Sequence, residues 1–296
     1  MQTDSTNQYP DDEIDLRQLV ATLWDGRWWI IATTFLGSAI AIAYALLATP
    51  VYRAEALVQI RQESQSGGRL SALAAQFGGQ ADFFGAAGGS GSDRALALAT
   101  LQSRVVIQAF IQDKNLLPEL FEKAWDPVNK RWNVNDPKKA PTLWHGYTAF
   151  SEGILKVTED KKNGLVTVAI DWRDPDVAAM WATELIAYTN AYLRDKTIMG
   201  SEKNLDYLRQ QVKQTGLVEL QQAVFTLVES ELKKLMLAKS GDEYAIKTID
   251  PAQAPKLRIK PKRRQIAILG FLLGGFIGVA AVLARNVFRP RTNPRS

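Results

Sequence analysis

Residues 265–284 read QIAILGFLLGGFIGVAAVLA, an uncharged run of twenty residues between Arg264 and Arg285. A helix of that length is about 30 Å long, which matches the hydrocarbon core of a bilayer. The alternative is a buried helix in a soluble core, but such helices seldom run so long without a polar side chain. The run therefore predicts a transmembrane helix. Gly270, Gly274 and Gly278 recur at every fourth position, so they share a face where another helix could approach closely.

A second uncharged run lies near the N-terminus. Residues 28–52 read WWIIATTFLGSAIAIAYALLATPVY and stand between Arg27 and Arg53. Tryptophan and tyrosine at the two ends of the run suit the headgroup level of a membrane. This run also has a small-residue face, made by Gly37, Ala41 and Ala45. The two predicted helices could pack against each other or against copies of themselves, and the sequence leaves both arrangements open.

A cleaved secretory signal is the competing interpretation of residues 28–52, because Ala43-Tyr44-Ala45 resembles a cleavage site. The apolar run is long for a signal peptide, however, and a long acidic tail precedes it where a signal has a short basic one. An apolar helix face is predicted just before the run, and it suits a helix lying at the membrane interface: Leu16, Leu19, Val20, Leu23 and Trp24. These features favour an uncleaved anchor.

The composition excludes several classes of function. The net charge of +5 is modest and spread along the chain, and no basic stripe with interleaved aromatics indicates nucleic-acid binding. Cysteine is absent, which excludes disulfides, thiolate metal sites and cysteine nucleophiles. The glycine-rich segment 64–92 has no phosphate-binding GxxxxGK[ST] or GxGxxG spacing. We therefore expect no cofactor and no metal.

The region between the two runs holds about 210 residues, enough for one substantial domain or two small ones. Its pattern predicts a strand over 52–60, a flexible loop with at most one short helix over 64–92, and a helix that begins at Ser92 or Asp93. An irregular stretch over 122–145 precedes a hairpin, whose strands over 154–159 and 165–172 flank the turn-forming pair Asn163-Gly164.

Two long helices follow the hairpin. Asp174-Pro175 is typical of a helix start, and helix-forming residues continue over 176–214. A helix of this length, about 58 Å, must project from a compact domain or pair with another helix. A second helix is predicted over 217–239, and extended structure over 243–250. The order strand, helix, strand, strand, helix, strand is that of a ferredoxin-like α+β domain.

Catalytic chemistry finds little support in the sequence. An enzyme acting on glycans would need paired carboxylates or an activated nucleophile, and the acids here fall mostly on helix faces and turns. Glu219, Glu229 and Glu231 are examples. His145 is the only histidine and lacks a neighbouring catalytic pattern, so we expect a structural role for it.

The charges that flank the two runs leave their orientation undecided, because the positive-inside rule is weak for a loop as long as the one between them. Four motifs occur in this order along the chain: EIDL at 13–16, LLPELF at 116–121, GLVTVAIDWRDPDVAAMWA at 164–182 and DPAQAPKLRIKPKR at 250–263. With them, the chain resembles the bacterial polysaccharide co-polymerases, the Wzz-type chain length determinants, over nearly its whole length.

This resemblance implies an inner-membrane protein with two spans, cytoplasmic termini and a periplasmic main domain. The implied parts are a cytoplasmic tail with an interfacial helix (1–27), a first transmembrane helix (28–50), a periplasmic ferredoxin-like base with long projecting helices (51–264), a second transmembrane helix (265–284) and a cytoplasmic tail (285–296). It further implies a ring-shaped homo-oligomer that acts on a Wzy-type polymerase and sets the length of O-antigen or a related lipid-linked glycan.

In the family, a segment with recurring prolines and glycines is linked to chain-length control and to contact with the polymerase. The residues that match it are Pro251, Pro255, Pro261, Gly270, Gly274 and Gly278. Membrane insertion and helix packing are the alternative roles for the same residues. Some relatives carry a tyrosine-kinase domain after the second span; residues 285–296 hold no Walker motif, so we expect no kinase activity. The alternative function is that of an adaptor for glycan export or for a separate tyrosine kinase.

Overall fold

The computed structural model describes residues 23–61, 90–134, 136–214, 218–241 and 243–288. The chain divides into two compact units. One unit is formed by the two ends of the chain, Met1–Pro50 and Ile259–Ser296, and the other by Val51–Arg258. The short strand β7 (Arg258–Lys260) stands at the boundary between them.

The unit formed by the chain ends holds the helices α2 (Arg27–Leu47) and α10 (Arg263–Phe288). Residues Arg27–Leu47 and Arg263–Arg285 are each long and apolar enough to cross a membrane, as predicted. Helix α10 begins before the predicted start at residue 265, because the Lys262 carbonyl already accepts helical hydrogen bonds from the Gln265 and Ile266 amides. Most apolar side chains of the two helices point outward, as lipid-facing side chains do.

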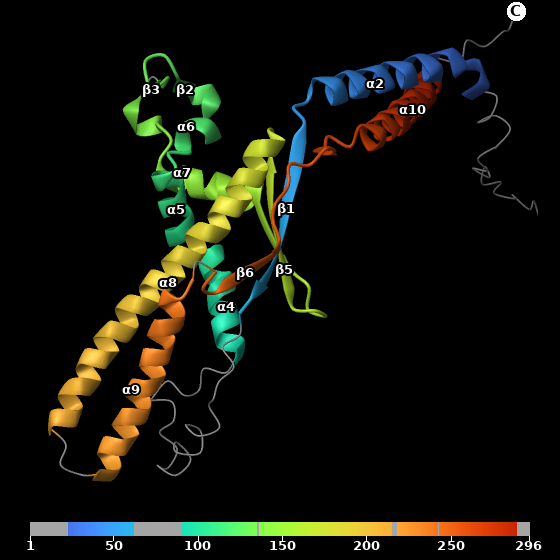
Figure 1. Ribbon diagram of the computed structural model, residues 1–296. Helices are drawn as coiled ribbons and strands as arrows, with labels where there is room; N and C mark the ends of the chain where they lie inside the picture. Colours follow the sequence, from blue (N-terminus) through green and yellow to red (C-terminus); the bar gives the residue numbers. More distant parts are fainter. Residues whose placement is uncertain (1–22, 62–89, 135, 215–217, 242, 289–296) are drawn as a thin grey trace, which may run out of the picture. The chain divides into compact units, whose positions relative to one another are not determined.

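The unit Val51–Arg258 is built on an antiparallel sheet with the strand order β4-β5-β1-β6 (Figure 1). Its strands are β1 (Val51–Ile60), β4 (Leu155–Glu159), β5 (Leu165–Trp172) and β6 (Ile246–Asp250). The first strand of the unit lies between the third and the fourth, which is the arrangement of a ferredoxin-like fold. The predicted fold class, α+β with long helices, is confirmed.

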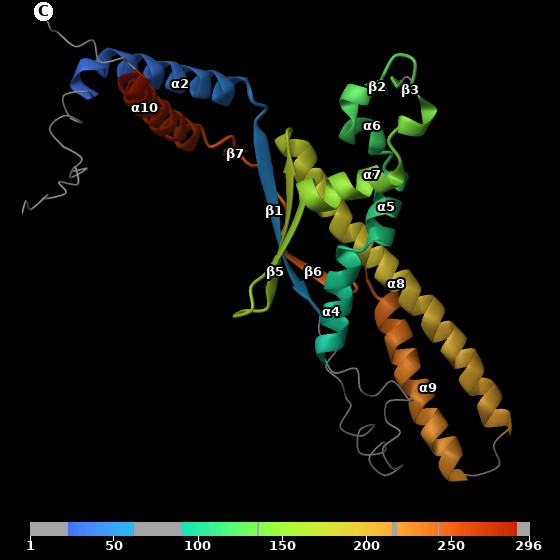
Figure 2. The same cartoon turned by 180° about the vertical axis from the view of Figure 1, so that it is seen from behind.

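Alternation of side chains along the strands creates the buried face of the sheet. Ala54, Ala56 and Val58 of β1 pair in register with Ile170, Val168 and Val166 of β5, and all six are fully buried. Helices cover this face; Figures 1 and 2 show α8 crossing it beside α4 and α5. The centre of the core is aromatic: Phe110, Phe150, Trp172, Trp181 and Tyr188 meet ring to ring.

Helix α8 (Pro175–Gln214) continues beyond the sheet and pairs with α9 (Val218–Lys239), as Figure 2 shows. The lengths match the predicted helices to within a residue. Leu205 and Val224 are buried in the pair, but Leu232, which the spacing places in the same seam, is 40% exposed. A partly buried polar contact joins the helices as well, since the Ser201 hydroxyl donates to the Glu231 carboxylate at 2.8 Å.

The segment between β1 and β4 differs from its prediction in two respects. The single helix expected from Ser92 or Asp93 consists of α4 (Ser90–Leu101) and α5 (Arg104–Asp113), bent by 45°. The break occurs because Ser103 is extended and its hydroxyl accepts a hydrogen bond from the Val106 amide, which starts a new helix. The helix and loop expected over 64–89 and the interfacial helix expected before residue 23 lie outside the described residues.

The stretch 122–145, expected to be irregular, contains short regular elements. After α6 (Leu117–Leu120) come η2 (Glu122–Ala124), the two-stranded hairpin β2 (Trp125–Asp126) and β3 (Arg131–Trp132), η3 (Pro137–Lys139), α7 (Leu143–Thr148) and η4 (Ala149–Ile154). Trp125 and Trp132 are cross-strand partners whose ring centroids lie 4.8 Å apart, edge to face. This aromatic pair and the turn of Asp126 hold a hairpin that has only two residues per strand.

Candidate functional site

The small residues predicted to form packing faces are brought together in the pair α2–α10. The helices run antiparallel: Gly26 lies beside Val282, Ile30 beside Gly278, Thr34 beside Gly274 and Ala41 beside Gly270. One contact therefore follows another at about every fourth position. Ala45, at the far end of the series, is 2% exposed. Of the two arrangements that the sequence leaves open, the described chain adopts packing of one helix against the other.

The backbones approach so closely that Cβ atoms would not fit at several positions. A Cβ built on Gly274 would lie 2.9 Å from Thr34 Cα, and one on Gly278 would lie 2.9 Å from Ile30 Cα. A Cβ on Gly37 would lie 3.1 Å from both the Gly270 carbonyl oxygen and Gly274 Cα. Real Cβ atoms essentially never come as near as 2.9 Å to another heavy atom. Glycine is thus required at Gly274 and Gly278 for this helix separation.

Thr33 and Thr34 of α2, which are not part of the predicted small-residue face, also line this contact. The Thr34 hydroxyl donates to the Ile30 carbonyl at 2.7 Å, and the Ser38 hydroxyl donates to the Thr34 carbonyl at 2.8 Å. Thr33 bonds back into the helix in the same way and lies against Gly278. Because each hydroxyl is satisfied inside its own helix, it can occupy an apolar contact at little cost. Thr33 and Thr34 precede Gly37 by four and three residues, a spacing that places them on the same helix face. The sequence could have indicated them by this spacing.

Arginines mark both ends of the helix pair. At one end the Arg263 guanidinium donates to the Ala45 carbonyl at 3.1 Å, which satisfies an acceptor in the last turn of α2. At the other end the Arg285 guanidinium lies 5.8 Å from the centroid of the Trp29 ring, a cation–π distance. Cations and tryptophans in these positions suit the two polar boundaries of a membrane.

The three predicted prolines do not join the glycines in one site. Pro251 follows β6 directly, and Pro255 lies further along the connection to β7. Pro261 follows a cis peptide bond with Lys260, and its carbonyl oxygen accepts from the Arg263 amide at 2.9 Å where α10 begins. The prolines are thus distributed along an extended connection, whereas the glycines lie within one helix contact.

The described residues offer no metal site. Among the described residues no group of three His, Asp or Glu side chains could hold a metal ion. The His145 ring nitrogen accepts a hydrogen bond from the Thr142 amide at 3.2 Å, and the Thr142 side chain completes a capping box at the start of α7. This is a structural role for His145.

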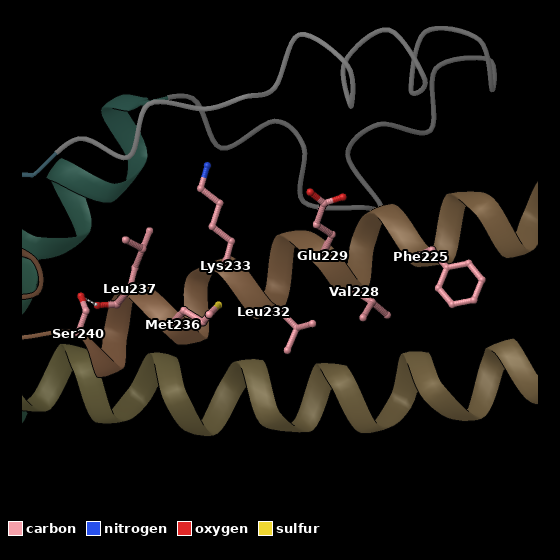
Figure 3. Close-up of a pocket in the computed structure, with 8 residues that line it drawn as sticks. All are labelled: Phe225, Val228, Glu229, Leu232, Lys233, Met236, Leu237 and Ser240. Atoms are coloured by element: carbon pink, nitrogen blue, oxygen red, sulfur yellow. Dashed lines mark hydrogen bonds between the residues drawn. The ribbon is translucent and has the colours of Figure 1, made fainter.

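Figure 3 shows an open apolar groove on α9. Val228 and Leu232 point toward α8, and the only charged side chains among the labelled residues, Glu229 and Lys233, point away from it. The groove thus offers no pair of carboxylates and no activated nucleophile. Its full lining is Phe225, Val228, Glu229, Leu232, Lys233, Met236, Leu237 and Ser240.

Two family models match the chain. The model described as "Chain length determinant protein", Wzz, matches residues 12–114, and the model described as "G-rich domain on putative tyrosine kinase" matches residues 207–287. The first includes α2 and the first strand of the sheet, and the second includes α9, β6 and most of α10. The predicted resemblance to the Wzz-type chain length determinants is thus confirmed. Together with the two apolar helices, this match indicates an inner-membrane protein.

Similar proteins of known name are larger than this chain. The tyrosine-protein kinase Etk of Escherichia coli O157:H7 is 36% identical over 122 residues, which are 41% of this chain and 15% of that protein. The tyrosine-protein kinase Wzc of Salmonella typhi is 33% identical over 170 residues, 53% of this chain and 21% of that protein. The matches thus span about a fifth or less of these relatives. A solved structure titled "full-length bacterial polysaccharide co-polymerase" aligns with 95% of this chain and 100% of its own, at 18% identity and a TM-score of 0.44.

Proposed function

We propose that this Wzz-type protein regulates polysaccharide chain length in Wzy-dependent polymerisation, as a non-catalytic oligomeric scaffold in the inner membrane. The glycan is O-antigen or a related lipid-linked polymer. The observation that carries the proposal is the glycine contact between α2 and α10, within a chain whose two ends match the chain length determinant and G-rich family models. A closely packed anchor of this kind would hold the chain in the membrane where it can meet a polymerase.

The glycine contact also indicates how Gly270, Gly274 and Gly278 contribute. Each glycine faces α2 of the same chain, so it acts by permitting the helices to pack. The outward side chains of α10, such as Leu272, Phe276 and Ile277, are then the ones available to a polymerase. Pro251, Pro255 and Pro261 would act by holding the connection to α10 extended, since proline restricts both its own backbone and that of the residue before it.

The scaffold is proposed to be a ring-shaped homo-oligomer. Support comes from the helix pair α8–α9, where Met199, Tyr207, Phe225 and Met236 are all more than half exposed. Large apolar side chains at such density are typical of a surface that binds another protein. The mass of the purified protein in detergent tests this proposal, because a strictly monomeric mass contradicts it.

The proposed orientation places both termini in the cytoplasm and residues 51–264 in the periplasm. The chain has no cysteine, so a single introduced thiol reports on its own location. We expect Lys196→Cys, an exposed position on α8, to react with a membrane-impermeant maleimide when only the outer membrane is permeabilised. Asp25→Cys, exposed beside the start of α2, should react only after the inner membrane is opened. The reverse pattern contradicts the proposed orientation.

Absence of catalysis is part of the proposal. Its support is that the α9 groove has a single carboxylate, Glu229, and that no group of His, Asp or Glu among the described residues could hold a metal ion. Purified protein that cuts or joins sugars by itself, or that phosphorylates tyrosine, would contradict it.

The function is tested by deleting the gene and separating the surface polysaccharide on a gel. Loss of the preferred chain length with continued polymer synthesis supports the regulator. A second candidate, an adaptor for export or for a separate tyrosine kinase, is favoured by relatives that are themselves named tyrosine-protein kinases. It predicts unchanged polymer length, together with lost export or lost phosphorylation of the kinase.

A further inference from the structure

One tryptophan of the unit Val51–Arg258 is exposed. Trp144 on α7 has 54% of its surface accessible, while Trp125, Trp132 and Trp172 are partly buried and Trp181 is 1% exposed. A large aromatic side chain held in water forgoes much of the stabilisation that burial provides. Trp144 therefore stands out as a residue placed for contact with a partner.

Two neighbours flank the exposed ring. The Arg104 guanidinium from α5 lies 5.8 Å from the centroid of the Trp144 ring, and the Tyr147 ring lies 5.8 Å from it, tilted by 47°. Among the described residues Arg104 has no carboxylate partner, so its donors are free to meet an anion. The three side chains, here called the Trp144 cluster, combine an aromatic surface with an available cation.

The Trp144 cluster is held in place by packing beneath it. Gly146 is buried where α7 meets α5, and a Cβ there would lie 2.8 Å from Leu117 Cδ2 and 3.5 Å from Ile111 Cδ1. The capping box of Thr142 and His145 fixes the first turn of α7, which carries Trp144. Figure 1 shows α5 and α7 adjacent. The cluster is therefore preorganised rather than carried on a loop, and that reduces the entropy lost on binding.

The charged residues nearest the Trp144 cluster in sequence are basic, and the acids that bound them are Asp113 at the end of α5 and Glu152 in η4. Residues 95–112 contain Arg104 and no acid, and residues 137–151 contain Lys138 and Lys139 and no acid. Lys138 and Lys139 are exposed in η3, immediately before α7. The one acid just upstream, Asp136, already accepts a hydrogen bond from the Lys138 amide. The surface around the Trp144 cluster is thus complementary to an anionic partner.

We propose that the Trp144 cluster binds acidic sugar units of a polysaccharide, an inference that rests on the proposed function. The apolar face of a pyranose ring stacks on an indole, and a sugar carboxylate pairs with the guanidinium of Arg104. Lys138 and Lys139 attract the polymer over a longer range. The cluster binds the glycan and takes no part in its chemistry.

The test uses the full-length protein in detergent and a fluorescently labelled oligogalacturonate, with a neutral dextran of similar length as comparison. We expect saturable binding of the oligogalacturonate and weaker binding of the dextran. Trp144→Ala and Arg104→Gln should each weaken binding about tenfold or more, as loss of an anchor residue does. Trp144→Phe, which keeps an aromatic face, should retain more affinity than Trp144→Ala.

Matched controls use exposed residues that lie outside the Trp144 cluster and have no proposed role in subunit contact. Val128→Ala removes an apolar side chain that is 87% exposed, and Arg209→Gln removes an exposed arginine. Both variants should bind oligogalacturonate like the wild type. Binding that is unchanged in Trp144→Ala overturns the proposal, and so does equal affinity for the neutral dextran. A change of oligomer mass in Trp144→Ala also overturns it, since the exposed ring would then belong to a contact between subunits.

The binding result is independent of chain-length control. If the deletion strain keeps its preferred chain length while the purified protein binds oligogalacturonate through Trp144, the proposed function fails and the binding site stands. If the deletion strain loses the preferred length but Trp144→Ala binds normally, the proposed function stands and this inference fails.

Discussion

Asn190 on α8 pairs with Ile246 of β6 as a neighbouring strand would. Its side-chain amide donates to the Ile246 carbonyl at 2.7 Å, and its side-chain oxygen accepts from the Ile246 amide at 2.8 Å and from the Ala245 amide at 3.0 Å. Asn190 is 2% exposed, so water cannot replace these bonds. One side chain thus fixes the start of the last strand of the sheet to the helix that covers it.

We predict that Asn190→Leu destabilises the sheet by about 2–4 kcal/mol, because buried backbone groups of β6 lose their partners. Hydrogen exchange at the Ala245 and Ile246 amides should accelerate strongly, and the melting temperature in detergent should fall. Asn204→Leu is the matched control, since Asn204 is exposed on the same helix. Equal protection of both amides in the Asn190 and Asn204 variants would contradict this role.

Arg53 and Asp171 are register partners across β1 and β5 and form a two-bond ion pair at 2.6 and 2.9 Å. The Asp171 side chain is 2% exposed and the Arg53 side chain 34%. We predict that Asp171→Ala costs about 2 kcal/mol, less than a fully buried pair because water reaches the arginine. Chemical denaturation measures the loss. The exposed pair Lys114–Glu184 is the comparison, and Glu184→Ala should have a clearly smaller effect.

The pH dependence of the Arg53–Asp171 pair has a definite sign. The hydrogen bond with Asp171 raises the pKa of Arg53 above its ordinary value. A raised pKa contributes stability below the unfolded-state value and loses it only as the pH rises through the folded-state value. The contribution of Arg53 should therefore be constant between pH 5 and pH 9. The destabilisation caused by Asp171→Ala should therefore not shrink as the pH rises within that window. If it does, the ion pair with Arg53 is not its source.

Acid should open the β2–β3 hairpin. Hydrogen bonds from the Asn129 side chain and from the Asn129 and Val128 amides lower the pKa of Asp126 below its ordinary 3.8. A lowered pKa stabilises the turn above the ordinary value, and this support is lost as the pH falls through the folded-state value. We predict that the circular dichroism of the coupled Trp125–Trp132 pair fades below about pH 3.8.

The Asp126→Asn variant is the control for this transition, because it has no carboxyl group to titrate at that position. If the circular dichroism of the hairpin fades equally at low pH in Asp126→Asn, a group other than Asp126 causes the transition.

Gly274 and Gly275 are adjacent glycines with different surroundings. A Cβ on Gly274 would lie 2.9 Å from Thr34 Cα, whereas one on Gly275 would lie at an ordinary 3.5 Å from the Thr34 hydroxyl oxygen. We predict that Gly274→Ala lowers the melting temperature in detergent and Gly275→Ala does not. Gly274→Leu should separate α2 from α10 and impair function while the unit Val51–Arg258 stays folded, as judged by its circular dichroism. Equal melting temperatures for the two alanine variants would contradict the packing role.

Local sequence patterns predicted much of this architecture. Alternation over 52–60, the Asn163-Gly164 turn and the Asp174-Pro175 helix start each depend on near neighbours, and each lies where it was expected. Non-local relationships could not be predicted in this way. The bond from Asn190 to Ile246 joins residues 56 positions apart. The sequence also does not indicate which helix packs against the glycines of α10. The break at Ser103 was predictable in principle, since serine is a common N-cap.

A strain that lacks the gene shows most directly whether the chain sets polysaccharide length from a glycine-packed anchor. The strain is complemented with the wild type, Gly274→Leu or Gly275→Ala, and the surface polysaccharide is separated by size. We predict a preferred chain length with the wild type and Gly275→Ala, and a broad distribution of lengths with Gly274→Leu at equal protein level. The same length distribution in the uncomplemented and the wild-type-complemented strains would contradict the claim.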